Sequence, residues 1–320
     1  MIDPHGRQLD YLRVSVTDRC NLRCIYCMPP EGVRQLRHED LLTFEEIART
    51  VAVGASLGLT KVRLTGGEPL VRKGVEALVG LLSRTAGVSH VTMTTNGILL
   101  AAMASTLRQQ GLHDLNVSLD TLRADRYRRI TRCGRVEDVL RGIDAALSAD
   151  FASVKINTVV MRGINDGEIA DFARLTLERP ITVRFIEFMA VGRTGLADED
   201  LLVPAASILE RIGELGAIES VETAKTSGPA QVFRLSGAAG AIGVIAPVTA
   251  PFCRTCNRLR LTSEGRLRSC LIRGGEVDLR ARLRGGASDE EIAQAFRETA
   301  AMKPLEYSCG ASIKMSRIGG

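Results

Sequence analysis

The sequence predicts an α/β fold: a partial (β/α)6 TIM-like barrel followed by a β-containing C-terminal extension. Over the first two thirds of the 320 residues, short apolar strand-like segments alternate with amphipathic helical segments. Repeated β-α-β units favour a parallel sheet with right-handed crossovers. Polar residues follow several of the predicted strands, and in a barrel they would converge on one mouth. This convergence favours a barrel over an open doubly wound sheet, which is the alternative.

The predicted strands and helices follow one another at regular spacing. The first helix has Thr43 before it and Glu46 three residues later, which is the pattern of a capping box. Strand-like apolar runs occupy residues 12–16, 62–64, 88–94, 115–119, 154–160 and 181–188. Helical periodicity occupies residues 44–57, 75–83, 99–109, 136–148 and 168–177.

The pattern changes after about residue 195, where Gly, Ala and Ser become frequent. Glu264-Gly265 is typical of a hairpin turn, which would place Cys256 and Cys270 on neighbouring segments. We therefore divide the chain into a barrel over residues 1–195 and an extension over residues 196–320. Within the extension we expect strands at 231–235, 241–245 and 259–262, and a last helix at 289–302 with a capping box formed by Ser288 and Glu291.

Composition narrows the class of protein. Apolar residues make up 45% and charged residues 25%, as in ordinary globular proteins. No apolar run is long enough for a membrane span, and the N-terminus lacks the pattern of a signal peptide, so we predict a cytoplasmic protein without a membrane partner. The net charge of +5 is modest, only 4% of residues are aromatic and Trp is absent, which argues against a nucleic-acid partner.

Three cysteines, Cys20, Cys24 and Cys27, share one short loop directly after the first predicted strand. A structural zinc ion or a closed electron-transfer cluster uses four protein ligands. A four-iron cluster held by three cysteines keeps one iron open for another ligand. In the reducing cytosol these thiols remain available for metal. The count and the spacing therefore predict a reactive iron–sulfur site.

A second set of three, Cys253, Cys256 and Cys270, lies far downstream. Two four-iron clusters, each with one open iron, are the simplest interpretation of the two sets. The alternative is a zinc ion at the second set, because Cys-x-x-Cys pairs are common zinc ligands. The fourth ligand of such a zinc site would be His113, Cys133 or Cys309.

Basic and polar residues lie within the predicted strands and at their ends. Arg13 shares a strand face with Ser15 and Thr17, and Arg63 shares one with Thr65. Basic residues that line a barrel mouth favour an anionic ligand, and guanidinium groups match phosphate oxygens, so a polyphosphate is the expected ligand. The other residues of this kind are Lys155, Arg258 and Arg260 within strands, and Thr94, Asn96, Ser118 and Asp120 at strand ends.

Two glycine pairs add to this pattern. Gly66-Gly67, in Thr65-Gly66-Gly67-Glu68-Pro69, would let a ligand approach free backbone N–H and C=O groups. A plain strand-to-helix turn is the alternative there. Gly319-Gly320 ends the chain, and such a tail could enter a narrow cavity where side chains would clash. Disorder is the alternative for the tail.

The first cysteine set, Tyr26 before its last cysteine, and the Gly66-Gly67-Glu68-Pro69 turn resemble the radical S-adenosylmethionine superfamily over about residues 10–190. The second cysteine set, the stretch Arg258-Leu259-Arg260 and the Gly319-Gly320 end extend the resemblance to the GTP 3′,8-cyclase family over essentially the whole chain.

That resemblance implies a lyase that converts GTP to (8S)-3′,8-cyclo-7,8-dihydroguanosine 5′-triphosphate in the first step of molybdenum cofactor biosynthesis. S-adenosylmethionine would bind the open iron of the first cluster and be cleaved to methionine and 5′-deoxyadenosine. The open iron of the second cluster would bind the guanine edge. The cofactors are thus two [4Fe-4S] clusters and S-adenosyl-L-methionine.

Residue roles also follow from the resemblance. The metal ligands would be Cys20, Cys24, Cys27, Cys253, Cys256 and Cys270. The S-adenosylmethionine contacts would be Tyr26, Gly67, Ser118 and Met189. The GTP contacts would be Arg13, Arg63, Thr94, Lys155, Arg258, Leu259 and Arg260. The residues expected to act in catalysis are Arg13, Arg258, Arg260, Gly319 and Gly320.

The expected partners are GTP as substrate, a flavodoxin or ferredoxin as reductant, and cyclic pyranopterin monophosphate synthase as the next enzyme; a homodimer is left open. Two other functions compete. One is another radical S-adenosylmethionine enzyme with an auxiliary cluster, for example a peptide-modifying one, which would not need Arg258 and Arg260. The other is a non-catalytic zinc or iron–sulfur module that binds RNA.

Overall fold

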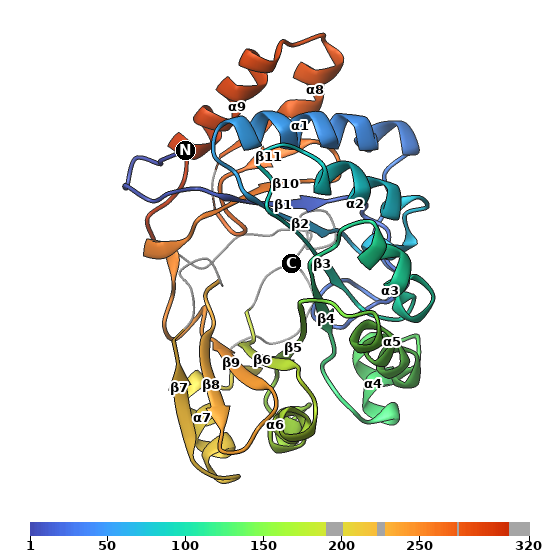
Figure 1. Ribbon diagram of the computed structural model, residues 1–320, viewed down its shortest axis with the longest axis vertical. Coiled ribbons are helices and arrows are strands. Elements are labelled where there is room, and N and C mark those ends of the chain that lie inside the picture. Colours follow the sequence, from blue (N-terminus) through green and yellow to red (C-terminus); the bar gives the residue numbers. More distant parts are fainter. Residues whose placement is uncertain (190–200, 223–227, 274, 307–320) are drawn as a thin grey trace.

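The computed structural model describes residues 1–189, 201–222, 228–273 and 275–306. In this part of the chain one twelve-stranded sheet runs in the order β12-β11-β10-β1-β2-β3-β4-β5-β6-β9-β8-β7. The sheet curves around an interior, and the helices α1 to α6 cover its outer side (Figure 1). The predicted partial barrel is therefore confirmed.

The six strands predicted for the barrel are all present, and neighbours pair in parallel from β1 to β6. Apolar side chains on their outer faces, such as Leu12, Val14 and Val183, are fully buried against the helices. The strands are β1 Tyr11–Ser15, β2 Lys61–Thr65, β3 His90–Thr95, β4 Asp114–Ser118, β5 Ser153–Val160 and β6 Thr182–Glu187.

The helices of the barrel begin and end close to the predicted residues, because apolar periodicity and caps mark their limits. The capping box of Thr43 and Glu46 is formed at the start of α1. The helices are α1 Phe44–Ser56, α2 Val75–Ser83, α3 Leu100–Gln109, α5 Val136–Ser148 and α6 Ile169–Glu178. Short 3-10 turns occupy His38–Asp40, Pro69–Val71, Asp166–Glu168 and Cys253–Thr255.

One barrel helix was not predicted. Helix α4, Ala124–Thr131, buries only Tyr127, Ile130 and Thr131, while most of its other residues are charged. The segment is amphipathic, but it is short and so rich in charged residues that as a whole it resembles a loop. Its position matters nonetheless, because its last residues hold the first cysteine loop, as described below.

The strands of the C-terminal region continue the barrel wall at both ends. β9, Ala241–Ile245, pairs in parallel with β6, and β10, Arg258–Leu261, pairs in parallel with β1. The remaining strands are antiparallel: β7 Ile218–Val221 and β8 Gln231–Leu235 beyond β9, and β11 Arg266–Arg268 and β12 Glu276–Asp278 beyond β10. The predicted boundary between residues 195 and 196 lies outside the described residues and stays a prediction.

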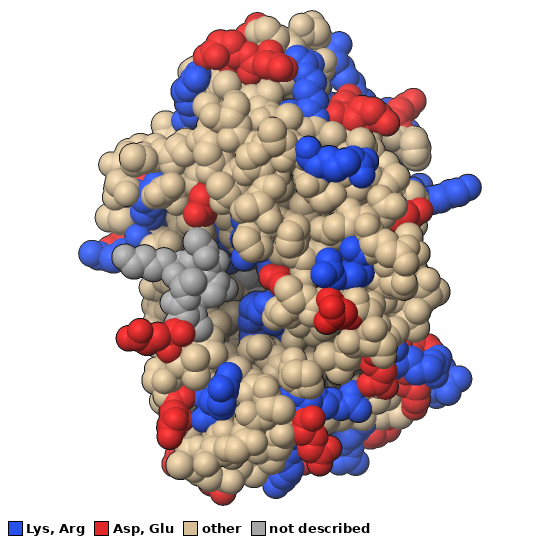
Figure 2. Space-filling model, in the orientation of Figure 1, with Lys and Arg blue, Asp and Glu red and all other residues tan. Residues whose placement is uncertain are grey.

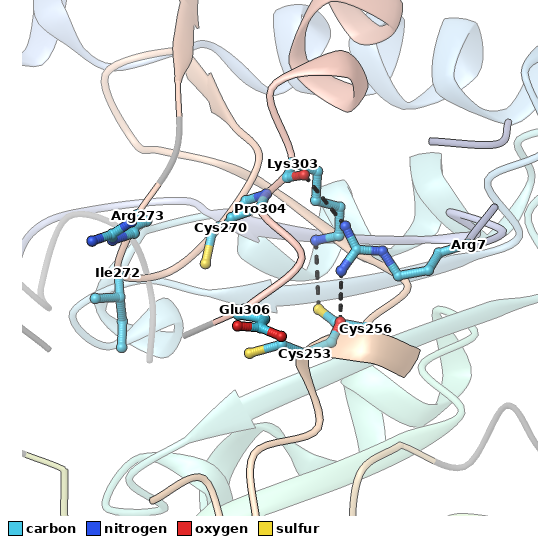
Figure 3. A pocket seen from close by; sticks show the side chains of 9 residues that line it. All are labelled: Arg7, Cys253, Cys256, Cys270, Ile272, Arg273, Lys303, Pro304 and Glu306. Carbon is cyan, nitrogen blue, oxygen red and sulfur yellow. Dashed lines mark hydrogen bonds between the residues drawn. The ribbon is translucent and has the colours of Figure 1, made fainter. Parts of the chain in front are cut away.

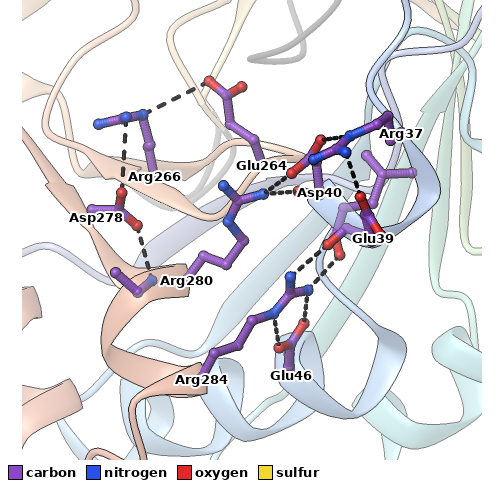
Figure 4. Close-up of polar contacts among 11 residues, drawn as sticks. Arg37, Glu39, Asp40, Glu46, Glu264, Arg266, Asp278, Arg280 and Arg284 are labelled. Carbon is purple, nitrogen blue, oxygen red and sulfur yellow. Dashed lines mark hydrogen bonds and ion pairs between the residues drawn. The ribbon is translucent and has the colours of Figure 1, made fainter.

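Ion pairs join the end of the chain to the beginning of the barrel. Arg284 pairs with Glu46 at 2.8 Å, and Arg280 pairs at 3.1 Å with Asp40, which also accepts from Arg37 (Figure 4). These pairs are partly exposed, so each adds little stability. They link the C-terminal helices to α1 and to the turn before it. Those helices are α8 Leu279–Arg284 and α9 Asp289–Ala301, with α7 Ala205–Gly213 nearer the other edge.

Within the described ranges, no helix has both the length and the apolar character that crossing a lipid bilayer requires.

Candidate active site

The first cysteine loop follows β1 and is held in place by backbone hydrogen bonds. The Cys27 amide donates to the Cys24 carbonyl at 2.9 Å, which closes a tight turn between two of the three thiols. The end of α4 anchors the loop from outside, because the Arg23 amide donates to the carbonyl of Thr131 and the Ile25 amide to that of Ile130. Three sulfur atoms thus lie within one anchored loop, and none forms a disulfide.

Burial controls the protonation of these thiols. It raises the pKa of Cys20 to about 11, that of Cys27 to about 12, and that of Cys24 well above its ordinary value. Metal binding therefore has to displace protons from buried sulfur. Among the described residues no group of three or more ligands is placed to chelate one metal ion. Thiolates of a cluster bind different iron atoms, so three separated sulfurs in a loop fit a cluster better than a single ion.

The Gly-Gly-Glu turn after β2 packs directly against the segment that leads into the cysteine loop. The Gly67 amide donates to the Thr17 carbonyl at 2.7 Å, and the Glu68 amide donates to the Arg19 carbonyl at 2.8 Å. A side chain at residue 67 would meet the Arg19 carbonyl oxygen at 2.4 Å. The expectation of a free N–H group is therefore wrong for Gly67, whose amide already binds this segment, and stays a prediction for Gly66. The carbonyl groups of the turn are the part left to a ligand.

Glu68 joins the turn to the end of β3. Its buried carboxylate accepts from the Leu70 amide, the Thr95 hydroxyl at 2.7 Å and the Asn96 amide at 2.6 Å. Burial raises the pKa of Glu68 to about 7, although these hydrogen bonds act in the opposite direction. Asn96 in turn donates to the side chain of Asn21 at 2.7 Å. The carboxyl ends of β2 and β3 are thereby tied to the cysteine loop.

The four residues predicted to contact S-adenosylmethionine all lie at the carboxyl ends of parallel strands or in the loop beside them. Gly67 follows β2, Ser118 ends β4 and Met189 follows β6. Tyr26, in the loop, donates its hydroxyl to the buried carboxylate of Asp120 at 2.6 Å. Burial raises the pKa of Asp120 to about 6. The fold brings the four residues to one edge of the sheet; their contacts stay predictions.

Strand register gathers the predicted basic residues on the inner face of the barrel. Arg13 on β1 has Arg63 of β2 as its register partner on one side and Arg260 of β10 on the other. Lys155 on β5 is the partner of Asn116 on β4. Figure 2 shows Lys and Arg atoms within the hollow at the middle of the molecular face. The structure thus brings together residues from four different strands that the sequence only suggested separately.

Three further residues of this inner face were missed. Tyr11 and Lys61 are register partners one pair before Arg13 and Arg63, and Arg184 on β6 is the partner of Asn157. The alternation of side chains along a strand could have identified them, because each lies two residues from another polar residue that faces the inside of the barrel. The Arg63 guanidinium donates to the Tyr11 hydroxyl and, at 3.3 Å, to Thr94.

The inner face carries an excess of positive charge. Burial lowers the pKa of Lys155 to about 8, against the opposing effect of Asp114, and lowers that of Arg184 to about 10. Burial alone would raise the pKa of Tyr11, yet the charges of Arg63, Arg13, Arg258 and Lys61 bring it down to about 8. Every shift favours the form with less positive charge. An anionic ligand would reverse this balance.

Two buried amide oxygens point to the same conclusion. Within the described residues, the side-chain oxygens of Asn116 and Asn157 have no hydrogen-bond partner. Buried acceptors in native proteins are normally satisfied, so unsatisfied ones in a candidate site indicate where a ligand donates. Both lie on the inner face, among the basic residues.

The second cysteine set lines a small pocket beside the amino end of β10 (Figure 3). Cys256 lies just before β10 and Cys270 just after β11, as the predicted hairpin required. Burial and the thiol of Cys270 raise the pKa of Cys253, whereas Arg258 and Lys303 outweigh burial and lower that of Cys256 to about 6. The pocket is lined by Arg7, Cys253, Cys256, Cys270, Ile272, Arg273, Lys303, Pro304 and Glu306.

Two of the residues named as a possible fourth zinc ligand, His113 and Cys133, do not lie at the second cysteine set. The His113 ring accepts from the Val91 amide and lies 5.4 Å from the His90 ring, centroid to centroid, at a tilt of 39°. Cys133 donates to the Asn21 carbonyl beside the first cysteine loop. Neither lines the pocket of the second set. Cys309 lies outside the described residues, as do Gly319 and Gly320.

The two cysteine sets lie at opposite ends of one strand pair. Cys20 follows the carboxyl end of β1, whereas Cys256 precedes the amino end of β10, and the two strands are parallel neighbours. Arg258 lies over the ring of Phe252 at 4.9 Å, near the second set. The side chain of Leu259 is fully buried on the outer face, so only its backbone is available to a ligand. The arginines of β1 and β10 therefore lie between the two sets.

Two protein-family models match the chain. The Radical SAM superfamily model covers residues 14–176, and the Molybdenum Cofactor Synthesis C model covers residues 181–309. Two solved structures share the fold. Streptococcus suis SuiB bound to S-adenosylmethionine aligns over 65% of this chain and 47% of its own, with a TM-score of 0.54 at 18% identity. Methylornithine synthase aligns over 65% of this chain and 63% of its own, with a TM-score of 0.50 at 18% identity.

Sequence relatives are closer. Proteins named GTP 3′,8-cyclase from Moorella thermoacetica and Geobacter sulfurreducens are each 48% identical over 100% of this chain, and over 100% and 99% of their own lengths. The one from Heliobacterium modesticaldum is 49% identical over 96% of this chain and 94% of its own. The radical SAM match implies a [4Fe-4S] cluster and S-adenosylmethionine as cofactors. With its two cysteine sets, its barrel and full-length relatives of this similarity, the chain belongs to the GTP 3′,8-cyclase family of the radical S-adenosylmethionine superfamily.

Proposed function

We propose that this protein cyclises GTP to (8S)-3′,8-cyclo-7,8-dihydroguanosine 5′-triphosphate, cleaving S-adenosylmethionine to methionine and 5′-deoxyadenosine, in the first step of molybdenum cofactor biosynthesis. Full-length relatives at 48% identity carry that activity in their name. The observation that carries the proposal is structural: three cysteines lie at each end of the β1–β10 pair, with Arg13 and Arg260 as register partners between them.

The first cysteine loop would hold the reactive cluster. Cys20, Cys24 and Cys27 supply three thiolates and leave one iron to S-adenosylmethionine. When bound and reduced, this cluster and S-adenosylmethionine together supply hydrogen-atom abstraction from the substrate. The carbonyl groups of the Gly66-Gly67 turn, which lie beside this loop, suit the amino group of S-adenosylmethionine.

The inner face of the barrel would hold GTP. Arg13, Arg63 and Lys155 present charged donors that suit the triphosphate. Thr94 already accepts from Arg63 and shares a register row with Asn116 and Lys155. Arg258 and Arg260 would extend the set of charged donors toward the second cysteine set, with Leu259 contributing only its backbone. The unsatisfied oxygens of Asn116 and Asn157 suit donors on the ribose or the base.

The second cysteine set would hold a second four-iron cluster whose open iron orients the guanine base. Three cysteines line one pocket. Unlike the thiols of the first loop, the Cys256 thiol has a lowered pKa, of about 6, because the charges of Arg258 and Lys303 outweigh the effect of burial. A thiolate beside buried cations is a suitable cluster ligand. In catalysis, Arg13, Arg258 and Arg260 would position GTP. Gly319 and Gly320, which lie outside the described residues, would enter the same site.

The remaining partners are proposals from the family. Reduction of the first cluster needs an outside electron donor, and a flavodoxin or ferredoxin has the required chemistry. Cyclic pyranopterin monophosphate synthase would consume the product. A homodimer stays an open prediction.

One anaerobic reaction tests the proposal. Protein reconstituted with iron and sulfide should contain about eight irons per chain. With dithionite, GTP and S-adenosylmethionine it should yield 5′-deoxyadenosine and the cyclised nucleotide in equal amounts by mass spectrometry. Deoxyadenosine without any GTP-derived product would contradict the substrate, and failure to bind GTP in calorimetry would point to a different radical enzyme. Stoichiometric zinc with little iron would contradict the whole proposal.

A further inference from the structure

Lys303 is a buried lysine that neither the relatives' names nor the sequence motifs single out. It follows α9 and is only 3% exposed, although lysine is rarely buried without a partner. In the described part of the chain, no carboxylate lies within ion-pair distance of its ammonium group. The charge of Lys303 must therefore be balanced by something other than an acidic side chain.

The ammonium group uses its three donors on the second cysteine site. It donates to the Sγ atom of Cys256 at 3.5 Å, to the carbonyl of Arg258 at 2.7 Å and to the carbonyl of Ser269 at 2.9 Å (Figure 3 shows the contact with Cys256). Arg258 is two residues after Cys256, and Ser269 directly precedes Cys270. One side chain thus connects the two segments that carry these cysteines.

The backbone of Lys303 is itself fixed by the N-terminal segment. Arg7 donates to the Lys303 carbonyl at 3.4 Å and to the Cys253 carbonyl at 2.6 Å, and the His5 ring lies 3.1 Å from the Lys303 carbonyl. Arg7 is held by Asp3 at 2.6 Å, so its own charge is balanced. Lys303 is therefore a buried cation of this site that, among the described residues, donates to sulfur and to carbonyl oxygens but to no carboxylate.

We propose that Lys303 is a positioning residue of the second cluster site: it holds the Cys256 and Cys270 segments together and, by donating to the Cys256 sulfur, raises the reduction potential of the four-iron cluster bound there. The inference rests on the proposed function, because it requires the second cluster. Three thiolates make such a cluster anionic, and reduction adds another negative charge. Hydrogen bonds to cluster sulfur and nearby positive charge favour the reduced form.

The test uses the full chain with the first cluster removed by Cys20→Ala, Cys24→Ala and Cys27→Ala, so that one cluster remains to be observed. This parent protein is reconstituted anaerobically and titrated with reductant, with the reduced cluster followed by electron paramagnetic resonance. We compare it with Lys303→Met, which removes charge and donors, and with Lys303→Arg, which keeps both. Lys73→Met is the matched control, because Lys73 is exposed and distant in sequence from both cysteine sets.

All four proteins should bind about four irons per chain. In Lys303→Met, the ratio of reduced to oxidised cluster at a fixed potential should fall at least tenfold, which is a shift of 59 mV or more to lower potential for one electron. Lys303→Arg should recover most of this loss, and Lys73→Met should match the parent. An unchanged potential in Lys303→Met with four irons bound would overturn the proposal.

Two further outcomes are decisive. If Lys303→Met binds no iron, Lys303→Gln, which keeps N–H donors without the charge, takes its place in the titration. Loss of iron from both neutral variants with an unchanged unfolding temperature of the apoprotein supports the positioning role, whereas loss of iron together with a collapsed fold overturns it. A parent protein without any cluster would contradict the proposed function itself. A normal cluster with the same potential in the parent and in Lys303→Met would contradict only the role of Lys303.

Discussion

Asn157 on β5 and Arg184 on β6 are register partners on the inner face of the barrel, and each has an unused hydrogen-bonding group. Among the described residues, the side-chain oxygen of Asn157 has no donor, and the guanidinium group of Arg184 is in no ion pair, although the charge of Asp114 acts to raise its pKa. An acceptor and a charged donor left open side by side indicate a ligand that has both donors and anionic oxygens. A nucleoside triphosphate meets that description.

Arg184→Met should therefore change substrate affinity and stability in opposite directions. Loss of one charged hydrogen-bonding partner should weaken GTP binding by ~1.5–3 kcal/mol, measured by calorimetry on the reconstituted protein. Loss of a positive charge from an already cationic face should raise the unfolding temperature of the apoprotein. Arg174→Met, on the exposed side of α6 and paired with Asp171, is the control and should alter neither quantity measurably. Unchanged GTP affinity in Arg184→Met would place this arginine outside the substrate site.

Tyr11 and Lys155 should each make the apoprotein more stable as the pH rises from about 8 to 10, whereas the buried thiols of Cys20, Cys24 and Cys27, whose pKa values are raised, act in the opposite direction. The pKa of Tyr11 falls from 10.0 to about 8 on folding, and that of Lys155 falls from 10.5 to about 8. Within this window Tyr11 and Lys155 bind more protons in the unfolded chain than in the folded one, so their contribution to stability increases with pH. Each group should contribute up to about 2 kcal/mol across the window.

Chemical denaturation of the apoprotein at several pH values between roughly 7.5 and 10 measures the free energy of unfolding across the range in which Tyr11 and Lys155 titrate. Because other groups also titrate, the informative quantity is the difference between wild type and variant. That difference should grow with pH for Tyr11→Phe and for Lys155→Met. A difference independent of pH would show that neither group has a shifted pKa in the folded protein.

Gly67→Ala should damage the first cysteine site without touching a cysteine. The added methyl group would lie 2.4 Å from the Arg19 carbonyl oxygen, so the segment before the cysteine loop has to move. Overpacking of this kind costs roughly 1–3 kcal/mol of unfolding free energy. We expect lower stability and a strong loss of S-adenosylmethionine binding.

Gly167→Ala is the matched control for Gly67→Ala, because nothing lies within 4 Å of the added methyl group there. Its unfolding temperature and its binding of S-adenosylmethionine should equal those of the wild type. Normal binding in Gly67→Ala as well would show that the turn tolerates a side chain and that its close packing does not serve the site.

The two cysteine sets should fail in different ways. Cys24→Ala removes a ligand of the proposed reactive cluster, so production of 5′-deoxyadenosine should stop. Cys256→Ala removes a ligand of the proposed second cluster, so cleavage of S-adenosylmethionine should continue while cyclised nucleotide is lost. Iron analysis and mass spectrometry of both products measure these outcomes. Deoxyadenosine from Cys24→Ala, or a wild-type yield of product from Cys256→Ala, would contradict the respective assignment.

Cys133→Ala is the control for these thiol substitutions. The Cys133 thiol lies beside the first loop but donates to the backbone carbonyls of Asn21 and Thr131. We expect its removal to leave iron content and product yield close to those of the wild type. A loss of four irons in this variant would make Cys133 a ligand after all.

Much of the fold could be predicted because the periodicity of apolar residues along the chain marks most helices and strands. The helices over 75–83 and 136–148 have the predicted limits, since their apolar positions repeat every three or four residues. The helix at 124–131 was missed because it is short and most of its residues are polar or charged. Alternation along strands likewise identified Arg13, Arg63 and Lys155 as members of polar strand faces, and the same alternation could have identified Lys61 and Arg184.

The sequence by itself determined the chemistry: three thiols within one loop and three more downstream imply metal, and arginines at alternate strand positions imply an anion. Only the tertiary structure decided that β10 pairs with β1, which places the two cysteine sets at opposite ends of one strand pair. It also decided that Lys303 contacts Cys256 and that Arg7 contacts Cys253. Spacing along a chain reports neighbours within a few residues, whereas these contacts join segments that are tens to hundreds of residues apart, and only tertiary packing brings them together.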